Sequence, residues 1–251
     1  MKQLFLLKTL LLIFIFTSFL ACEKKTNQPT TNQTNNIKIG VYYPLTGEIA
    51  TFGQFGKKGV EMAVDEINKS GGLLGRQVEA IYEDTRGLQQ DSSIAVQKLI
   101  DKDKVIGVLG ESASTNSIAG GQVCQEKKIP MITPSSTNPQ VTQIGDYIFR
   151  ICFLDDFQGE VMARFAFNTL KAKRVAILYD NGSDYSLGLE QFFSETLKKL
   201  GGEIIAKEAY QKQDVDFSSQ LTKIKGLNPD AIYIPGYYTQ VGQIAQQSRK
   251  L

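Results

Sequence analysis

The sequence predicts an α/β fold in which helices cover both faces of parallel β-sheets. Apolar, β-rich runs alternate along the chain with stretches of helical periodicity. The runs begin about 25–40 residues apart, the spacing of repeated strand-helix units. They are continuously apolar rather than alternating, which is typical of strands buried on both faces of a parallel sheet.

The first series of elements occupies residues 37–133. We expect strands over Ile37–Tyr43, Val78–Tyr82, Val105–Leu109 and Ile129–Thr133. We expect helices over Gln54–Asn68, around Ala95–Ile100 and over Thr115–Glu126. In the first helix, Val60, Ala63, Val64 and Ile67 recur at helical spacing, and Ser70-Gly71-Gly72 follows as a terminator.

A second series follows a break. The run Tyr147–Phe153 reads as a strand, and the segment 155–159 (DDFQG) interrupts it. We expect strands over Arg174–Tyr179, Glu203–Ala209 and Ala231–Ile234. We expect helices over Val161–Leu170, Tyr185–Leu200 and Phe217–Lys225, and one that starts near Thr239. The sequence thus predicts two α/β lobes, 37–153 and 154–251, joined near residues 152–158, with the second lobe incomplete.

The N-terminal residues resemble an export signal. Lys2 and Lys8 precede or flank an apolar run that is too short to cross a bilayer, and a small residue, Ala21, ends it. We expect a signal peptide over 1–21 and lipidation of Cys22, although cleavage nearby without lipidation is an alternative. Residues 22–36 are polar and predict a flexible tether. The mature protein would lie in the periplasm or on the outer face of the cell membrane.

Composition excludes several function classes for this chain. It has no histidine, so it offers no histidine-dependent catalytic triad or general base. Removal of residues 1–21 would leave 26 basic and 26 acidic side chains, which predicts no basic face for nucleic acid. Phosphate-loop, dinucleotide-binding and EF-hand patterns are absent from the sequence. We expect no enzyme activity, metal or cofactor.

The two remaining cysteines have two interpretations. Cys124 lies on a predicted helix and Cys152 in a strand-like run. An exported protein could pair them. Two unpaired core thiols are the interpretation that we favour.

Loops that follow strands are the candidate ligand-binding segments. The loops 110–116 (GESASTN) and 134–139 (PSSTNP) offer hydroxyls and backbone N–H groups at helix N-termini, which favour an anion. Plain N-capping explains the same residues equally well. Tyrosines follow two strands of the second lobe, where they would cover a ligand or pack in the core. Ser112 approaches a nucleophile-elbow pattern, but Ser114 replaces its last glycine and no histidine could activate it.

Six segments carry a family resemblance. They are IKIGVYYPLTGEIATFG (37–53), INKSGGLLGRQVE (67–79), PMITPSSTNPQVT (130–142), FRICFLDDFQGEVMA (149–163), VAILYDNGSDYSLGL (175–189) and PDAIYIPGYYTQVG (229–242). In this order they resemble the periplasmic branched-chain amino-acid-binding proteins of ABC transporters, the type I group similar to Leu/Ile/Val-binding proteins. The resemblance spans residues 37–251.

The resemblance implies a two-lobed clamshell that closes on an amino acid, with a permease and ATPase complex as partners. The residues that match ligand-contacting positions of the family are Ser114, Ser135, Ser136, Thr137, Tyr185, Tyr237 and, less closely, Phe52. A sensor module of the same fold and a binder of a small amide such as urea remain alternatives. Family members continue beyond the position of Leu251, so we expect an incomplete chain. The acidic partner of the ligand ammonium has no match here, although Asp156 and Asp184 lie nearby.

Overall fold

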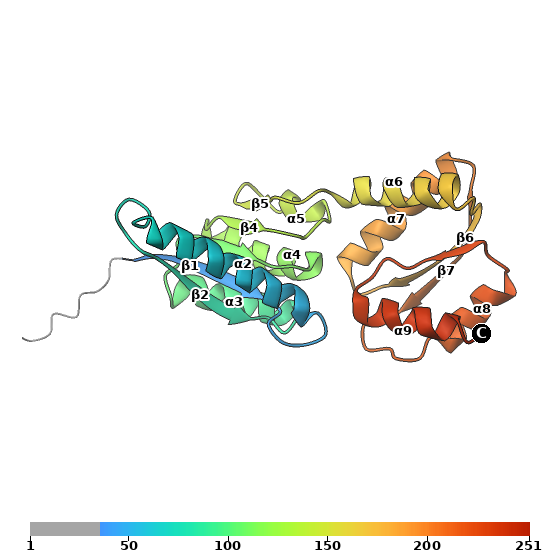
Figure 1. The fold of residues 1–251 in the computed structure, drawn as a ribbon, viewed down its shortest axis with the longest axis horizontal. Coiled ribbons are helices and arrows are strands. Elements are labelled where there is room, and N and C mark those ends of the chain that lie inside the picture. Colours follow the sequence, from blue (N-terminus) through green and yellow to red (C-terminus); the bar gives the residue numbers. More distant parts are fainter. Residues whose placement is uncertain (1–35) are drawn as a thin grey trace, which may run out of the picture. The chain divides into compact units, whose positions relative to one another are not determined.

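The computed structural model describes residues 36–251, which contain two parallel sheets. The strand order is β2-β1-β3-β4-β5 in the first sheet and β7-β6-β8 in the second, and Figure 1 shows helices packed along both. We call the parts built on these sheets the first and second lobes. The predicted signal peptide, Cys22 and all but the last residue of the predicted tether lie outside the described residues.

The first lobe contains five strands and four helices among the described residues. The strands are β1 (Ile37–Tyr43), β2 (Val78–Asp84), β3 (Val108–Gly110), β4 (Met131–Thr133) and β5 (Ile148–Arg150). The helices are α2 (Ala50–Lys69), α3 (Gln89–Asp101), α4 (Ser114–Lys127) and the short α5 (Gln140–Gln143). All neighbouring strands in this sheet pair in parallel, as the sequence predicted.

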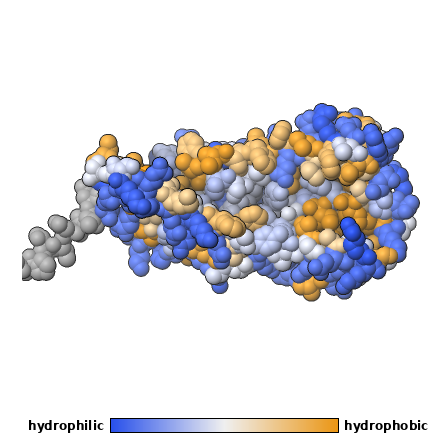
Figure 2. Space-filling model, in the orientation of Figure 1, coloured by the Kyte–Doolittle hydropathy of each residue, from blue (hydrophilic) through white to orange (hydrophobic). Residues whose placement is uncertain are grey.

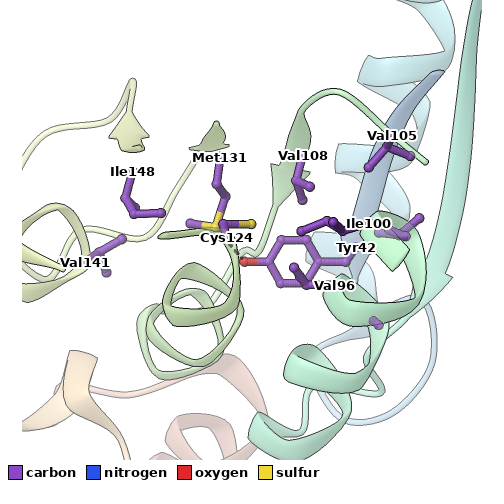
Figure 3. Packing of buried hydrophobic residues seen from close by; sticks show 11 residues of the cluster. Tyr42, Val96, Ile100, Val105, Val108, Cys124, Met131, Val141 and Ile148 are labelled. Carbon is purple, nitrogen blue, oxygen red and sulfur yellow. Dashed lines mark hydrogen bonds between the residues drawn. The ribbon is translucent and has the colours of Figure 1, made fainter. Parts of the chain in front are cut away.

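A single apolar cluster holds one face of the first sheet against α3 and α4. It includes Val96 and Leu99 of α3, Cys124 of α4, and Met131 of β4. Tyr42 lies fully buried among them, and its hydroxyl donates to the Met131 sulfur at 3.0 Å, the dashed line in Figure 3. For α3, the apolar spacing read from the sequence therefore identifies the inner face of the helix.

The other face of the first sheet is only partly covered. The predicted apolar face of α2 borders a cavity of about 460 Å³, together with Ile39, Leu109 and Ile132 of the strands. Val60 and Val64 line this cavity and are half-buried. The periodicity of α2 is thus correct, but among the described residues its apolar face meets a void rather than a packed partner.

The second lobe is built around β6. Its strands are β6 (Arg174–Asp180), β7 (Glu203–Tyr210) and β8 (Ala231–Tyr233). Its helices are α6 (Asp155–Arg164), the π-helix η1 (Phe165–Thr169), α7 (Asp184–Lys199), α8 (Ser218–Gly226) and α9 (Tyr238–Ser248). Successive β6 side chains enter two different clusters, because side chains alternate across a strand: Val175 and Ile177 join one, Ala176 and Leu178 the other.

The strand β8 forms one edge of the second sheet. All three of its residues are only half-buried. Figure 2 shows hydrophobic residues gathered over this sheet, between α6 and α9, on the face in view. The central strand β6 is thus covered on both faces, whereas the edge strand β8 is only partly covered.

The segment predicted to join the lobes is partly helical, which corrects the expected hinge. Residues 155–158 form the first turn of α6, so the helix begins before the predicted Val161. Asp155 and Asp156 favour a helix N-terminus electrostatically. Gly159, taken from the sequence as a break, lies inside the helix. A Cβ there would come within 2.6 Å of Phe192 Cβ, so the glycine permits α6 and α7 to pack closely.

Other differences from the predicted elements are smaller. Strands β3, β4 and β5 have only three residues each, shorter than the apolar runs that contain them. Pro130 has no N–H and directly precedes β4. The four-residue helix α5 was not predicted, because a single turn has too few positions to show periodicity.

Both described cysteines are unpaired, as favoured from the sequence. Cys124 is a core thiol, but Cys152 is only half-buried. Within residues 36–251, no helix is both long and apolar enough to cross a membrane. The same residues contain no cluster of three or more potential metal ligands of the His, Cys, Asp or Glu type.

Candidate functional site

Two hydroxyl-rich loops meet at one edge of the first sheet. The first follows β3 and leads into α4, and the second follows β4. Because β3 and β4 are paired neighbours in parallel, their carboxyl ends lie side by side. Ser135 Oγ of the second loop donates to the Ser112 carbonyl of the first at 3.1 Å. The two candidate ligand-binding loops therefore meet in the structure.

The buried side chain of Glu111 organises the first loop. Its carboxylate accepts hydrogen bonds from Thr85 Oγ1 at 2.7 Å, Ala113 N at 2.6 Å and Asn116 Nδ2 at 3.2 Å. Burial raises the pKa of Glu111, and these hydrogen bonds oppose part of that shift. The carboxylate thus fixes the chain just before α4. In the sequence, the signal for this role was a single charged residue, Glu111, among the small residues of the loop 110–116.

The carbonyl of Glu111 ties the second loop to the first. It accepts from Thr133 Oγ1 at 2.6 Å and from Ser136 Oγ at 3.0 Å. Ser136 Oγ also lies 2.7 Å from Ser117 Oγ. Ser136 is fully buried and does not line the cavity described below. The structure therefore places this predicted ligand contact in the internal network, where its hydroxyl already has two partners.

Ser114 begins α4 at the point where the loops meet. The N-cap residue is Ala113, and no side chain caps this helix. Ser114 Oγ instead accepts from Asn138 N of the second loop, at 3.2 Å. The simple capping interpretation is therefore wrong for Ser114. The first N–H groups of α4 have no partner inside the helix and attract negative charge.

Two tyrosines of the second lobe face these loops. Tyr185 lies in the first turn of α7 and Tyr237 directly precedes α9. Their rings stack with centroids 5.2 Å apart, and Gln158 Nε2 donates to the Tyr185 hydroxyl at 3.1 Å. Burial raises the pKa of both phenols, so both remain protonated at neutral pH and can donate hydrogen bonds.

Phe52 completes the aromatic side from the first lobe. It lies in α2, and its ring meets the edge of Tyr237 at a centroid distance of 6.1 Å. Its side chain is 44% exposed, which places it at the rim. Three rings from two lobes thus meet around one point of the structure.

A cavity of about 280 Å³ lies between the loops and the tyrosines. The predicted residues that line it are Phe52, Ser114, Ser135, Thr137, Tyr185 and Tyr237. The remaining lining residues are Ile49, Ser112, Ala113, Phe153, Gln158, Gly236 and Tyr238. None of these side chains is charged at neutral pH, and the volume is near the lower end of small-molecule sites. The arrangement suits a small ligand that is neutral overall.

Hydrogen bonds join the lobes beside this cavity. Asp184 N donates to Thr115 Oγ1 at 2.8 Å, and Asn138 Nδ2 donates to Asp184 O at 2.6 Å. Lys212 Nζ donates to the Gly87 carbonyl at 2.8 Å. Asp184, one of the two acids that the sequence offered near the site, thus joins the lobes through its backbone N–H and carbonyl rather than through its carboxylate. None of these contacts could be read from the sequence, because each joins residues far apart in the chain.

Arg150 supports the second loop from β5. Its guanidinium donates to the carbonyls of Ser136, Asn138 and Pro139 at 2.8–3.0 Å, and to Thr142 Oγ1 at 2.6 Å. These bonds fix the loop that carries Thr137. A single charge inside the apolar run 147–153 was the sequence signal for this role.

Asp155 is a second buried acid that the sequence did not reveal. It is the first residue of α6, is fully buried, and neither carboxylate oxygen has a hydrogen-bond partner within the described residues. Burial raises its pKa to about 6, and the Thr137 hydroxyl and the Arg150 charge oppose part of the shift. Such an unsatisfied group is costly, which makes it a candidate for a functional role.

The sequence matches a known protein family and several of its members. Residues 36–251 match the family described as periplasmic binding protein. A Leu/Ile/Val-binding protein, BraC3, of Rhizobium johnstonii is 37% identical over 217 residues, which are 86% of this chain and 59% of that protein. The chain thus spans about 59% of the length of this curated relative.

Two solved structures are similar in fold and sequence. A leucine-binding protein, LivK, of Thermotoga maritima has a TM-score of 0.82 and 42% identity, covering 85% of this chain and 60% of its own. The branched-chain amino-acid transporter substrate-binding protein LivJ of Streptococcus pneumoniae, in complex with isoleucine, has a TM-score of 0.79 and 37% identity. That match covers 86% of this chain and 61% of LivJ.

Proposed function

Because this chain belongs to the periplasmic binding protein family, we propose that it is the substrate-binding component of an ABC importer for an apolar amino acid. The observation that carries the proposal is the composition of the 280 Å³ cavity. Hydroxyls and the N-terminus of α4 lie on one side and aromatic rings on the other. A zwitterion with an apolar side chain needs these two environments together.

The α4 end of the cavity is the place for the ligand carboxylate. Unpaired N–H groups at a helix N-terminus stabilise an anion without a basic side chain. Ser114 adds a hydroxyl donor there, since its oxygen only accepts from Asn138 N in the structure. The aromatic side, with Phe52 and the stacked tyrosines, would cover the apolar side chain.

Ligand binding would stabilise the contact between lobes. Tyr185 and Tyr237 belong to the second lobe, whereas Ser114 and Thr137 belong to the first, so one ligand touches both. A closed, liganded form would then present the permease with a surface that differs from the open form. The non-helical residues 151–154, rather than the helical 155–158, would absorb this motion.

Export and anchoring form the remaining part of the proposal. The sequence pattern at Ala21-Cys22 would place a lipid on Cys22 and hold the protein at the outer face of the cell membrane. Metabolic labelling with a fatty acid tests this: label that persists in Cys22→Ser would contradict anchoring through that residue.

Calorimetric titration of the full-length protein tests the ligand class. We expect heat from leucine, isoleucine or valine and none from aspartate, lysine, urea or acetamide. The charged amino acids serve as controls because no lining side chain could pair with a second charge. An absence of binding for every apolar amino acid would contradict the proposal, and binding of an amide alone would replace it.

A further inference from the structure

The second lobe has a basic surface at the end of its sheet that lies away from the candidate site. Strands β6, β7 and β8 run in parallel, and the tyrosines of the site follow their carboxyl ends. The opposite, amino ends of the strands lie beside the ends of the helices, in the segments 170–174, 198–203, 223–230 and 249–250. We call these four segments the basic end. They contain nine of the 24 basic side chains of residues 36–251 and two of the 25 acidic ones.

Hydrogen bonds hold the first three of these segments side by side. Glu203 N donates to the Lys173 carbonyl at 2.7 Å, and Asp230 N donates to the Arg174 carbonyl at 2.8 Å. The Arg174 guanidinium donates to two carbonyls that follow α8, at 3.0 and 3.1 Å. The basic end is therefore one continuous part of the surface rather than a set of scattered charges.

Most cations of the basic end have no acidic partner. All nine are exposed: Lys171, Lys173, Arg174, Lys198, Lys199, Lys223, Lys225, Arg249 and Lys250. Within residues 36–251, Lys223 is the one member of this set that forms an ion pair, with Glu208. A cation in the last turn of a helix stabilises the helix dipole, but this effect does not reach beyond that turn. It therefore does not account for Lys173 and Arg174, which lie at the start of β6.

Two exposed leucines lie among these cations. Leu170 directly precedes Lys171 and is 56% exposed, and Leu227 lies two residues after Lys225 and is 43% exposed. Basic side chains with apolar ones between them suit the surface of an anionic bilayer. The cations lie near the lipid phosphates, and the apolar side chains enter the boundary of the acyl chains. The leucines thus favour a bilayer over a purely polar polyanion.

We propose that the basic end is a membrane contact, which binds the second lobe to an anionic phospholipid bilayer. The inference goes beyond the proposed ligand-binding function and requires no ligand. The predicted tether joins the first lobe just before β1, at the amino end of the first sheet. A lipid on Cys22 would restrain the first lobe, and the basic end restrains the second. With both lobes held at the bilayer, the cavity between them stays close to a permease in the same membrane.

Vesicle co-sedimentation tests this contact. The full-length protein is used without its predicted signal peptide and with Cys22→Ser, so that no lipid on the protein contributes. The vesicles contain phosphatidylcholine alone or phosphatidylcholine mixed with phosphatidylglycerol. We expect binding to the anionic vesicles at about 0.05 M NaCl and little at about 0.5 M, because salt screens exposed charges. Absence of binding to the anionic vesicles at low salt, or equal binding to both kinds of vesicle, would overturn the inference.

Reversal of three charges locates the contact. The variant that combines Lys171→Glu, Lys198→Glu and Lys199→Glu should bind the anionic vesicles about a hundredfold more weakly. Each lysine near an anionic bilayer strengthens binding about fivefold, so three together give this factor. Leu170→Ala should weaken binding a few-fold and leave the salt dependence unchanged, because it removes apolar contact without changing charge.

The matched control reverses three exposed lysines of the first lobe, Lys102, Lys104 and Lys128, none of which forms an ion pair within residues 36–251. It changes the net charge by the same amount and should bind the vesicles nearly as the wild type does. An equal loss in the two triple variants would show an effect of net charge alone and would overturn the inference. Binding of soluble polyglutamate without binding of vesicles would assign the basic end to an acidic macromolecule and would also overturn it.

Leucine titration separates this inference from the proposed function. Both triple variants should bind leucine as the wild type does, because the changed side chains are exposed and do not line the cavity of the candidate site. Circular dichroism melts check that the variants fold. A wild type that binds anionic vesicles but no amino acid would refute the proposed function and support the membrane contact. A wild type that binds leucine but not the vesicles would do the reverse.

Discussion

Replacing Asp155 by asparagine should stabilise the ligand-free protein at neutral pH. The carboxylate is fully buried without a hydrogen-bond partner among the described residues, and its pKa rises from 3.8 to about 6. The folded protein therefore binds this proton more tightly than the unfolded chain does. The stability from this proton is complete below pH 4 and is lost as the pH rises through 6.

The size of the effect follows from the shift. Two pKa units at 1.36 kcal/mol each give at most about 3 kcal/mol at pH 7, and relaxation and water penetration around the ionised group reduce this to about half. Asp155→Asn cannot titrate, so its advantage over the wild type should grow from near zero at pH 4 to about 1.5–3 kcal/mol at pH 7. For a chain of this size, that corresponds to a rise in Tm of about 3–12 °C.

Thermal unfolding followed by circular dichroism, without ligand, at several pH values between 4 and 8 measures this difference. Asp156→Asn should follow the wild type at every pH, because its side chain is exposed. A variant at Asp155 that is less stable than the wild type at pH 7 would refute the reasoning, since it would show that the carboxylate has a cationic partner in the folded protein.

Three further substitutions separate binding from structure. Ser114→Ala should weaken leucine binding by about 1.5–3 kcal/mol in calorimetry, because one charge-assisted hydrogen bond is lost; unchanged affinity would assign Ser114 to the contact with Asn138 alone. Ser136→Ala should instead lower the free energy of unfolding by about 1–3 kcal/mol in urea melts, because it removes a buried partner of Ser117 and Glu111. A loss of affinity without a loss of stability would contradict that assignment. Gly188→Ala should weaken ligand binding by about 1–3 kcal/mol, because its Cβ would lie 2.9 Å from Asn138 Nδ2 across the contact between lobes. Gly242→Ala, which meets nothing within 4 Å, is its control and should bind normally.

Much of the fold follows from local patterns in the sequence. The continuously apolar run 175–178 predicted a strand buried on both faces, and β6 divides its residues between two clusters. Hydrophobic spacing located α3, because its inner face packs in the apolar cluster of the first lobe. The start of α6 was missed, because Gly159 weakens the helical pattern for a reason that lies in another helix.

From the sequence, site residues could be predicted only where the position of a loop at the end of a strand decides which residues come together. Ser114 and Thr137 follow paired strands, so their meeting at one edge required no knowledge of side-chain contacts. Sequence position could not distinguish Ser136, whose hydroxyl turns into the network of Glu111. The burial of Asp155 likewise depends on contacts between α6, α7 and the second loop, which no local pattern encodes.

A crystal structure of the full-length protein with leucine is the most direct test of the proposed function. We predict density for the amino acid in the 280 Å³ cavity, with its carboxylate at the N-terminus of α4. The side chain should contact the rings of Tyr185 and Tyr237. Leucine bound elsewhere, or bound in this cavity with its ammonium rather than its carboxylate at α4, would contradict the proposed site.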